Sequence, residues 1–270
     1  MKNLKIFCTS LEHLKILDKL PSYVFKIGLG SNNFPNDWYD EKKGENISYL
    51  NKYYGEFTGI YWIWKNLLNK FDDNDLVGNC HYRKLWLNDL YTSKNSAIYQ
   101  SLYSRLLSQK NPLLNNSDTF QVQPIIFKNK NLLEDFKIIH KNDSLEKSIY
   151  FLETNLQNKF KKHLLENKLY PLNMFITTPK KFNEYCEIVF PWLEKCFEYC
   201  ETNKFLKDYN IRMPAFLAER FTSFWFSQNS SSCLSYARLG NIFLSNRINN
   251  VFNPIKLPFT FKMYPTLHRY

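Results

Sequence analysis

Residues 81–84 are the part of this sequence whose side chains best suit chemistry. His81-Tyr82-Arg83-Lys84 places an imidazole, a phenol and two cations in consecutive positions. A guanidinium binds phosphate oxygens through two parallel hydrogen bonds, and a protonated imidazole would add another donor. The segment therefore favours recognition of an anionic group such as a diphosphate. The alternative is a strand end that simply leaves the sheet into a solvated loop.

Two carboxylates elsewhere in the chain are candidates for accepting a proton. Glu56 lies near the start of a predicted helix, where it is either a charge favoured by the helix dipole or a group aimed into a site. Glu219 precedes Arg220 inside a strongly apolar stretch, and buried charges are rare unless they are paired or functional. The alternative for Glu219 is an internal ion pair with Arg220.

The candidate side chains must be positioned by strands and helices, which the apolar segments of the sequence predict. Residues 76–80 follow the polar turn 72–75 and predict a buried, central parallel strand that delivers residues 81–84 to its carboxyl end. Open α/β sheets bind ligands at that edge. Strands over 4–9 and 23–28, with a short helical or loop segment between them, predict the start of a βαβ layout.

The remaining elements are read from the spacing of apolar residues and from the prolines. A strand is predicted over 169–179 with Asn173 at its polar start, and Thr119–Phe127, which contains Pro124, is predicted to be an edge strand or a loop. Residues 34–46 predict a long loop of the kind that is often functional. Helices are predicted over 53–69, 96–107, 132–140, 145–167, 179–203 and 213–228.

The composition narrows the class of protein. The chain has 270 residues, a hydrophobic share of 44% and a net charge of +11, which indicates a globular protein suited to an anionic partner or simply a soluble basic surface. There is no GxGxxG or GxxxxGK[ST] segment, so a dinucleotide site of the Rossmann type and a P-loop are not expected. The sequence also lacks zinc-finger spacing, a basic heptad region and an RNP-like motif, so no nucleic acid partner is predicted.

The cysteines and the hydropathy indicate in which cellular compartment the protein is expected. None of the six cysteines forms a CxxC pair and no secretion signal is recognised, so free thiols in a reducing cytoplasm are expected. Cys196 and Cys200 are predicted to lie in the core of an amphipathic helix. No apolar run approaches the roughly 20 residues of a membrane span, so any membrane link is expected to be peripheral.

Five segments stand out together: Gly44-Glu45-Asn46-Ile47-Ser48, residues 51–66, residues 77–84, Asn173-Met174-Phe175-Ile176 and Phe216-Leu217-Ala218-Glu219-Arg220. In combination they resemble one known family, the glycosyltransferase-like domain of bacterial capsular polysaccharide and lipopolysaccharide loci, long classed as a domain of unknown function. The likeness covers roughly residues 4–228, and His140 falls where the family carries a histidine. This sequence departs from the family pattern at Gly55, Asn79, Lys84 and residues 213–215.

The resemblance implies a fold and an activity. It implies a GT-A-like (Rossmann-like) α/β domain with a mixed, mostly parallel sheet flanked by helices and a helical C-terminal part. We expect this domain over residues 1–228, with a C-terminal extension over 229–270 that packs on it. The implied reaction moves a sugar from a nucleotide-diphosphate donor, a UDP-sugar being the first expectation, to a growing capsular or lipopolysaccharide glycan.

The site residues follow from the resemblance and the chemistry together. Glu219 is predicted to be the base that takes the acceptor proton, and Arg220 to orient it or bind phosphate. Arg83 and His81 are predicted to stabilise the departing diphosphate. The predicted catalytic residues are thus His81, Arg83 and Glu219, and the predicted donor- or substrate-binding residues are Thr9, Asn46, Glu56, Tyr82, Lys84, Asn173 and Arg220.

The sequence and the resemblance also lead to expectations about a metal cofactor and about binding partners. GT-A enzymes usually carry Asp-x-Asp where this chain has residues 81–83, so no metal cofactor is predicted. The alternative is Mn²⁺ or Mg²⁺ held by His81 with Asp37 or Asp40. The acceptor glycan is expected to be lipid-linked, at the inner face of the cytoplasmic membrane, with peripheral contact to anionic lipid. The rival hypothesis is a non-catalytic module that binds glycan or nucleic acid through its basic charge and aromatic residues.

Overall fold

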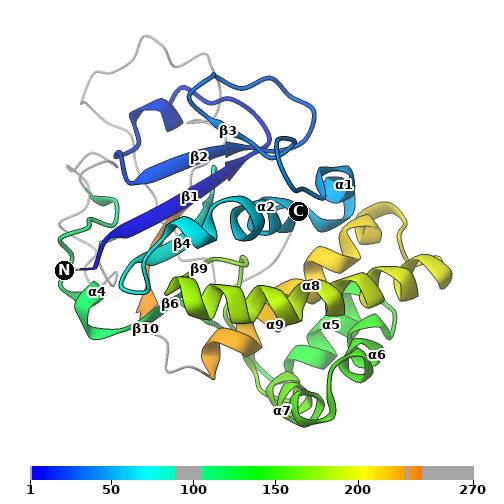
Figure 1. The fold of residues 1–270 in the computed structure, drawn as a ribbon. Coiled ribbons are helices and arrows are strands. Elements are labelled where there is room, and N and C mark those ends of the chain that lie inside the picture. Colours follow the sequence, from blue (N-terminus) through cyan, green and yellow to red (C-terminus); the bar gives the residue numbers. More distant parts are fainter. Residues whose placement is uncertain (1, 89–104, 229–231, 239–270) are drawn as a thin grey trace, which may run out of the picture.

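The computed structural model describes residues 2–88, 105–228 and 232–238. Within them, nine strands form one mixed sheet whose main path runs β10-β6-β9-β4-β1-β2-β3, with β5 joined to β4 and β11 joined to β5 (Figure 1). A separate pair, β7 and β8, is antiparallel. The strands are β1 (Leu4–Ser10), β2 (Val24–Gly28), β3 (Tyr39–Asp40), β4 (Leu76–His81), β5 (Lys84–Trp86), β6 (Thr119–Val122), β7 (Ile125–Ile126), β8 (Lys168–Leu169), β9 (Phe175–Thr177), β10 (Ser232–Leu234) and β11 (Tyr236–Arg238).

Most neighbouring strands of the main path run parallel. β1 is parallel to both β2 and β4, β2 to β3, and β10 to β6, whereas β9 is antiparallel to both of its neighbours. The mostly parallel mixed sheet confirms the predicted fold class. The α-helices are α1 (Asn51–Tyr54), α2 (Phe57–Asn66), α4 (Leu113–Asn116), α5 (Leu132–His140), α6 (Ser144–Ser148), α7 (Thr154–Leu164), α8 (Pro179–Thr202) and α9 (Met213–Ser227).

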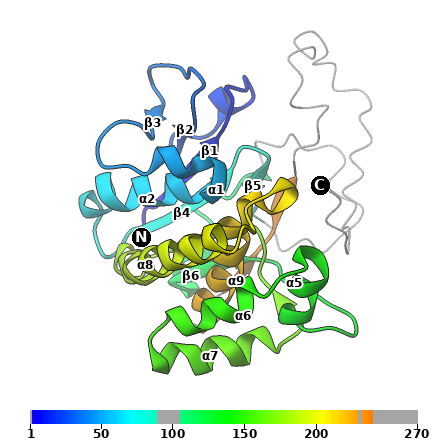
Figure 2. The ribbon, with the colours of Figure 1, turned by 90° about the vertical axis from the view of Figure 1, so that its right-hand side faces the viewer.

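Alternating side chains of the buried strands supply two separate cores. Phe7 of β1 and Val77 of β4 point to one face, and their neighbours Ile6 and Leu76 point to the other. α2, α8 and α9 pack on the first face, and α5, α6 and α7 lie beyond α8 and α9, away from β1 and β2 (Figure 2). The second face is covered by a smaller cluster that includes Trp86.

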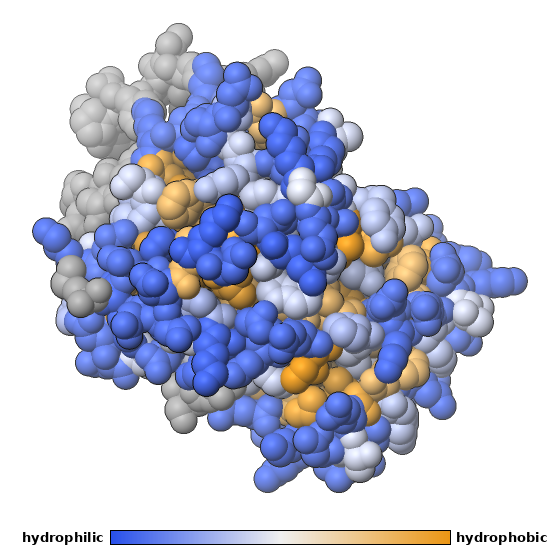
Figure 3. Space-filling model, in the orientation of Figure 1, coloured by the Kyte–Doolittle hydropathy of each residue, from blue (hydrophilic) through white to orange (hydrophobic). Residues whose placement is uncertain are grey.

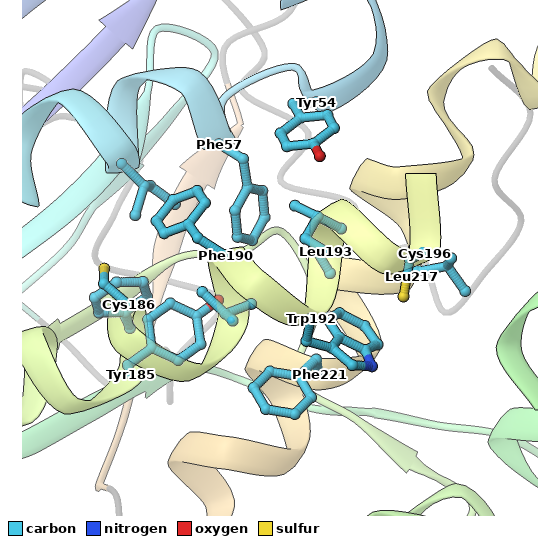
Figure 4. Packing of buried hydrophobic residues seen from close by; sticks show 14 of the residues in the cluster. Tyr54, Phe57, Tyr185, Cys186, Phe190, Trp192, Leu193, Cys196, Leu217 and Phe221 are labelled. Carbon is cyan, nitrogen blue, oxygen red and sulfur yellow. The ribbon is translucent and has the colours of Figure 1, made fainter. Parts of the chain in front are cut away.

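Aromatic residues fill the larger core. Tyr54 and Phe57 approach from the α1–α2 segment, Tyr185 and Trp192 from α8, and Phe221 from α9 (Figure 4). The Trp192 and Phe221 rings stack with centroids 4.8 Å apart. Such stacked pairs add about 0.5–1.5 kcal/mol beyond the area that they bury. The aromatic-rich composition is therefore explained by packing between these helices.

Two predicted helices are interrupted in the structure. The helix predicted over 53–69 breaks at Gly55, whose φ of +54° is outside the helical region; it becomes α1, α2 and a 3-10 turn over Leu68–Lys70. The helix predicted over 145–167 is divided into α6, a 3-10 turn over Ile149–Phe151 and α7, because Leu152 and Glu153 are extended. Apolar spacing continues across both breaks, which is why periodicity alone misses them.

Two strand predictions also need correction. The edge strand or loop predicted over Thr119–Phe127 contains β6, which is an inner strand between β10 and β9; Pro124 follows it and so removes no ladder hydrogen bond. The single strand predicted over 169–179 is β8 and β9 with a sharp corner between them. β10 and β11 continue the sheet beyond residue 228. Residues 96–104 of the helix predicted over 96–107, and residues 239–270, lie outside the described residues.

Hydrophilic residues cover most of the face in Figure 3, and hydrophobic ones interrupt it mainly at the lower right. Cys196 and Cys200 are buried on α8, which confirms the prediction that they belong to the core. Among the described helices, none combines the length and hydropathy that a membrane span requires.

Candidate active site

The carboxyl ends of β1, β2 and β4 meet at one edge of the sheet, because these strands run parallel. Thr9 of β1 lies beside His81 of β4 in the register. β9 runs antiparallel to β4, so Asn173, just before its start, lies at the same edge. The structure thus brings together three predicted site residues at the edge where open α/β sheets bind ligands.

Leu172 and Asn173 form a sharp corner before β9, named here the 172–173 corner. Both residues have left-handed backbone, with φ of +80° and +52°. A non-glycine residue in this region costs about 1–3 kcal/mol and persists only where its surroundings hold it. Strain of this kind gathers at functional sites, so the contacts that hold the corner show which side chains shape the site.

Two predicted catalytic side chains hold the backbone of Leu172. The Nε2–H of His81 donates to the Leu172 carbonyl oxygen at 2.6 Å, and the Leu172 N–H donates to Glu219 Oε1 at 2.7 Å. Because a carbonyl only accepts, the proton of the neutral imidazole is on Nε2. This leaves His81 Nδ1 directed at Thr9 Oγ1, 3.5 Å away.

His81 is a neutral group rather than a cation near pH 7. Burial lowers its pKa, and the nearby Glu56 carboxylate only partly opposes that change, while Lys84 adds to it. The sequence-based prediction gave His81 a phosphate-binding role if protonated. In the structure its Nε2–H is already engaged by Leu172, so its local effect is to hold the corner.

Asn79 holds the other half of the corner and is a residue that the sequence analysis did not single out as functional. Its Nδ2 donates to the Asn173 carbonyl at 2.7 Å, and its Oδ1 accepts from the Phe175 N–H at 3.0 Å. The side-chain amide therefore replaces the ladder bonds that β9 lacks at its start. The signal available in the sequence was an amide within an apolar strand, at a position where the related family is usually apolar. The structure shows that this amide is buried.

Glu56 reaches the corner from the segment before α2. Its Oε1 accepts from Asn173 Nδ2 at 2.9 Å, and its Oε2 accepts from Arg212 at 3.0 Å. Burial alone would raise the pKa of Glu56, but His81 in its protonated form, which acid populates, the Arg212 cation and the Asn173 hydrogen bond outweigh it and hold the pKa below its usual value. Glu56 is therefore an ionised carboxylate at the site, with 19% of its side chain exposed.

Arg212 was also missed by sequence reasoning, and Gly55 explains how it reaches Glu56. A Cβ on Gly55 would collide with the Arg212 guanidinium, and the φ of +54° is itself strained for any other residue. Gly55 therefore both ends α1 and makes room for the cation. An isolated arginine just before a predicted helix gives no signal of this role.

Residues 82–84 surround the turn that follows β4. Arg83 is 49% exposed and lies 3.9 Å from Glu12, which is a long and weak surface ion pair. The Arg83 guanidinium also lies over the Tyr82 ring, 4.9 Å from its centroid. Lys84 is half-buried, and its backbone lies opposite that of His81 where β5 pairs with β4. Arg83 is thus an accessible cation at the site edge, as a diphosphate-binding residue must be.

Arg220 lies in a buried chain of charges. Its guanidinium donates to Glu219 Oε2 at 2.7 Å and lies 3.7 Å from Asp135, which is itself 2.6 Å from Lys130. Only 4% of the Arg220 side chain is exposed. This geometry fits the predicted role of orienting Glu219, whereas it offers little surface for binding phosphate.

Asn46 stands apart from the other predicted site residues. Its Nδ2 donates to the carbonyls of Lys42 and Gly44, and its Oδ1 accepts from Ser48. These bonds close the loop in which it lies. The structure gives Asn46 a local role and shows no contact with the 172–173 corner.

The donor set at the edge does not fit a divalent cation. The ring nitrogen of His81 that carries a lone pair, Nδ1, is directed at Thr9 Oγ1, and the Arg212 cation already neutralises the Glu56 carboxylate. Asp37 pairs with Lys26 and Asp40 bonds its own loop, so neither joins His81. In the part of the chain that the structure describes, no group of three histidine, cysteine or acidic side chains could hold a metal ion.

Acid is expected to destabilise the protein through two buried histidines outside the site edge. Burial lowers the pKa of both His140 and His163 to about 4. The unfolded chain, with a histidine pKa near 6.5, binds these protons first, so stability is lost as the pH falls from about 6.5 to about 4. We expect a loss of about 1.4 kcal/mol per pH unit for each histidine, measured by urea unfolding between pH 7 and 5.

Matched variants test that pH dependence. His140→Gln and His163→Gln should each flatten the slope, and His13→Gln, at an exposed histidine, should leave it unchanged. An equal slope in all three variants and the parent would show that other groups govern acid unfolding.

Comparisons with known proteins identify a protein family and a fold class for this chain. Residues 5–230 match the protein family described as "Domain of unknown function (DUF4422)". The apo structure of the bifunctional glycosyltransferase WbbM is similar to this chain, with a TM-score of 0.66 and 19% identity. The match covers 89% of this chain and 46% of WbbM, so the chain spans about half of that protein. No curated protein matches the sequence. The likeness shows a mixed α/β fold of the GT-A-like class.

Proposed function

The chain belongs to the DUF4422 family, and we propose that it is a glycosyltransferase that moves a sugar from a nucleotide-diphosphate donor to a glycan. One observation carries the proposal. The carboxyl edge of the sheet combines an accessible cation, Arg83, with an ionised and partly exposed carboxylate, Glu56, around the strained 172–173 corner. Inverting transfer of a sugar from a diphosphate can use these two groups, the cation for the leaving diphosphate and the carboxylate for the acceptor proton.

The donor side uses the turn after β4. Arg83 binds the diphosphate oxygens through its guanidinium and stabilises the negative charge that grows as the bond to the sugar breaks. Tyr82 supports the guanidinium with its ring, Lys84 adds positive charge beside it, and Thr9 borders the nucleotide. The donor proposed first is a UDP-sugar.

The acceptor side needs a carboxylate. As the acceptor hydroxyl oxygen bonds to the anomeric carbon, the diphosphate leaves with the electron pair of the broken bond, and the carboxylate takes the hydroxyl proton. The prediction that Glu219 is this base stays open to test. The geometry supports Glu56 more strongly, because 19% of its side chain is exposed against 10% for Glu219, and its partner Arg212 is exposed whereas Arg220 is buried against Glu219.

The acceptor and location are proposed from the resemblance and the charge. We propose a capsular or lipopolysaccharide glycan, carried on a lipid at the inner face of the cytoplasmic membrane. The net charge of +11 favours contact with anionic lipid there. Because the residues at the edge do not fit a divalent cation, the proposed reaction needs no metal.

A thermal-shift screen with UDP-, GDP-, CDP- and TDP-sugars tests the function. One of the four kinds of nucleotide sugar is expected to raise Tm by about 5–10 °C. A ligand that binds only the folded state stabilises it by about 2.7 kcal/mol when its concentration is 100 times its Kd. The shift should persist in excess chelator, and Arg83→Gln should remove it while Lys195→Gln, on the exposed face of α8, keeps it.

Two results would contradict the proposal. A shift with oligosaccharides but with no nucleotide sugar would favour the non-catalytic binding module. Loss of the shift and of sugar transfer in chelator, restored by Mn²⁺, would contradict the metal-free mechanism alone.

A further inference from the structure

A cavity of about 440 Å³ opens between α7, β8 and the last turns of α9, away from the 172–173 corner. Its size falls within the range of about 300–1,000 Å³ that is usual for small-molecule sites. Its wall contains basic side chains and the rings of Tyr170 and Phe224. None of the site residues discussed above lines it.

The charge of the cavity is positive. Lys159, Lys162 and Lys168 line it against a single acid, Glu166. Within the described residues, Lys159 and Lys162 have no ion-pair partner, whereas Lys168 bonds to Tyr170. Cations in the last turn of a helix are often explained by the helix dipole, and Lys162 fits that account. Lys159 lies before that turn and Lys168 lies outside α7, so the dipole does not explain the set.

Two residues of the cavity wall, Tyr170 and His163, are joined through the buried Ser223. The Tyr170 N–H donates to Ser223 Oγ at 3.0 Å, and Ser223 Oγ lies 3.2 Å from His163 Nε2. With the Ser223 hydroxyl donating to Nε2, the proton of the neutral His163 ring is on Nδ1, which lies 3.5 Å from Glu166. The single acid of the wall thus lies beside a neutral histidine, and within the described residues it forms no ion pair with the three lysines.

We propose that this cavity is a second anion site, which binds an organic phosphate. Lys159, Lys162 and Lys168 contact the phosphate as point charges with several donors each, and the Tyr170 and Phe224 rings cover the organic part. The segment that lines the cavity continues into the 172–173 corner: Tyr170 bonds to Ser223, and Leu172 bonds to Glu219 one turn earlier on α9. Two sources carry this chemistry, a soluble phosphate ester and the phosphate of a lipid headgroup.

The test uses two probes and a matched pair of charge reversals. Glycerol 3-phosphate, followed by calorimetric titration, represents the soluble source, and phosphatidylcholine vesicles with and without phosphatidylglycerol represent the lipid source. Lys159→Glu/Lys162→Glu should weaken binding of the effective probe at least about tenfold, since it replaces two cations that contact the phosphate with anions that repel it. Lys147→Glu/Lys161→Glu makes the same charge change on α6 and α7 outside the cavity and should bind like the parent.

Each outcome decides the proposal. Selective loss with either probe supports it and identifies the source. No binding of either probe, equal binding by both variants, or equal loss in both overturns it. The nucleotide-sugar thermal shift should be unchanged in Lys159→Glu/Lys162→Glu, so failure here is separate from failure of the proposed transferase.

Discussion

Replacing Glu56 with Gln is expected to lower kcat/KM for sugar transfer by about 10²–10⁴-fold, the range that a general base contributes. The Glu56 carboxylate is ionised because its pKa is lowered, and it is the more exposed of the two site carboxylates, at 19% against 10% for Glu219. Gln keeps the size and the oxygen that accepts from Asn173 but cannot take a proton near neutral pH. The measurement is steady-state transfer to a glycan acceptor.

Stability and a matched variant separate catalysis from folding. The ion pair of Glu56 with the partly exposed Arg212 contributes at most about 1 kcal/mol, so Tm should change little. Glu45→Gln alters an exposed carboxylate bonded to Tyr61, in the loop packed on α2, and should retain parental activity. Near-parental turnover in Glu56→Gln would exclude Glu56 as the base.

Replacing Glu219 with Ala is expected to destabilise the protein by about 3–5 kcal/mol, because it removes one member of a buried ion pair. Arg220 would keep its buried charge with only the more distant Asp135, and the Leu172 N–H would lose its acceptor at a strained position. The free energy of unfolding in urea measures the effect. Glu198→Ala, an exposed change on α8, should cost little.

Glu219→Gln distinguishes the two roles considered for this residue. Its amide oxygen can still accept from Leu172, so most of the fold should survive. If transfer then falls 100-fold or more in a folded protein, Glu219 is the base that the sequence predicted. If turnover stays near the parental value, Glu219 is a residue that positions the corner.

Much of the scaffold was predictable because local patterns and the final packing agree. The apolar run before His81 is a central strand, Pro179 begins α8, and the apolar stretch around Glu219 is α9. Predictions were wrong where one residue overrides a continuing pattern. Gly55 has a backbone conformation that ends α1, although the apolar spacing continues into α2.

The sequence singled out three residues of the candidate site that lie together in the structure, but not how they are bonded. Residue type and position singled out Glu56, His81 and Asn173, and the structure brings them together. Asn79 and Arg212 act through partners far away in the sequence, so no local pattern indicates them. The left-handed backbone of Leu172 could not be foreseen either, because leucine rarely adopts it and only tertiary contacts hold it there.

The bonding of the 172–173 corner also has a consequence for the order of folding. Its partners lie on both sides of it in the sequence: Glu56 and Asn79 precede it by about a hundred residues, and Glu219 and Thr222 follow it by almost fifty. A growing chain cannot complete the corner until residue 222 has been synthesised. The shape of the site edge therefore depends on contacts that close loops of about fifty to about a hundred residues, each of which costs loop-closure entropy.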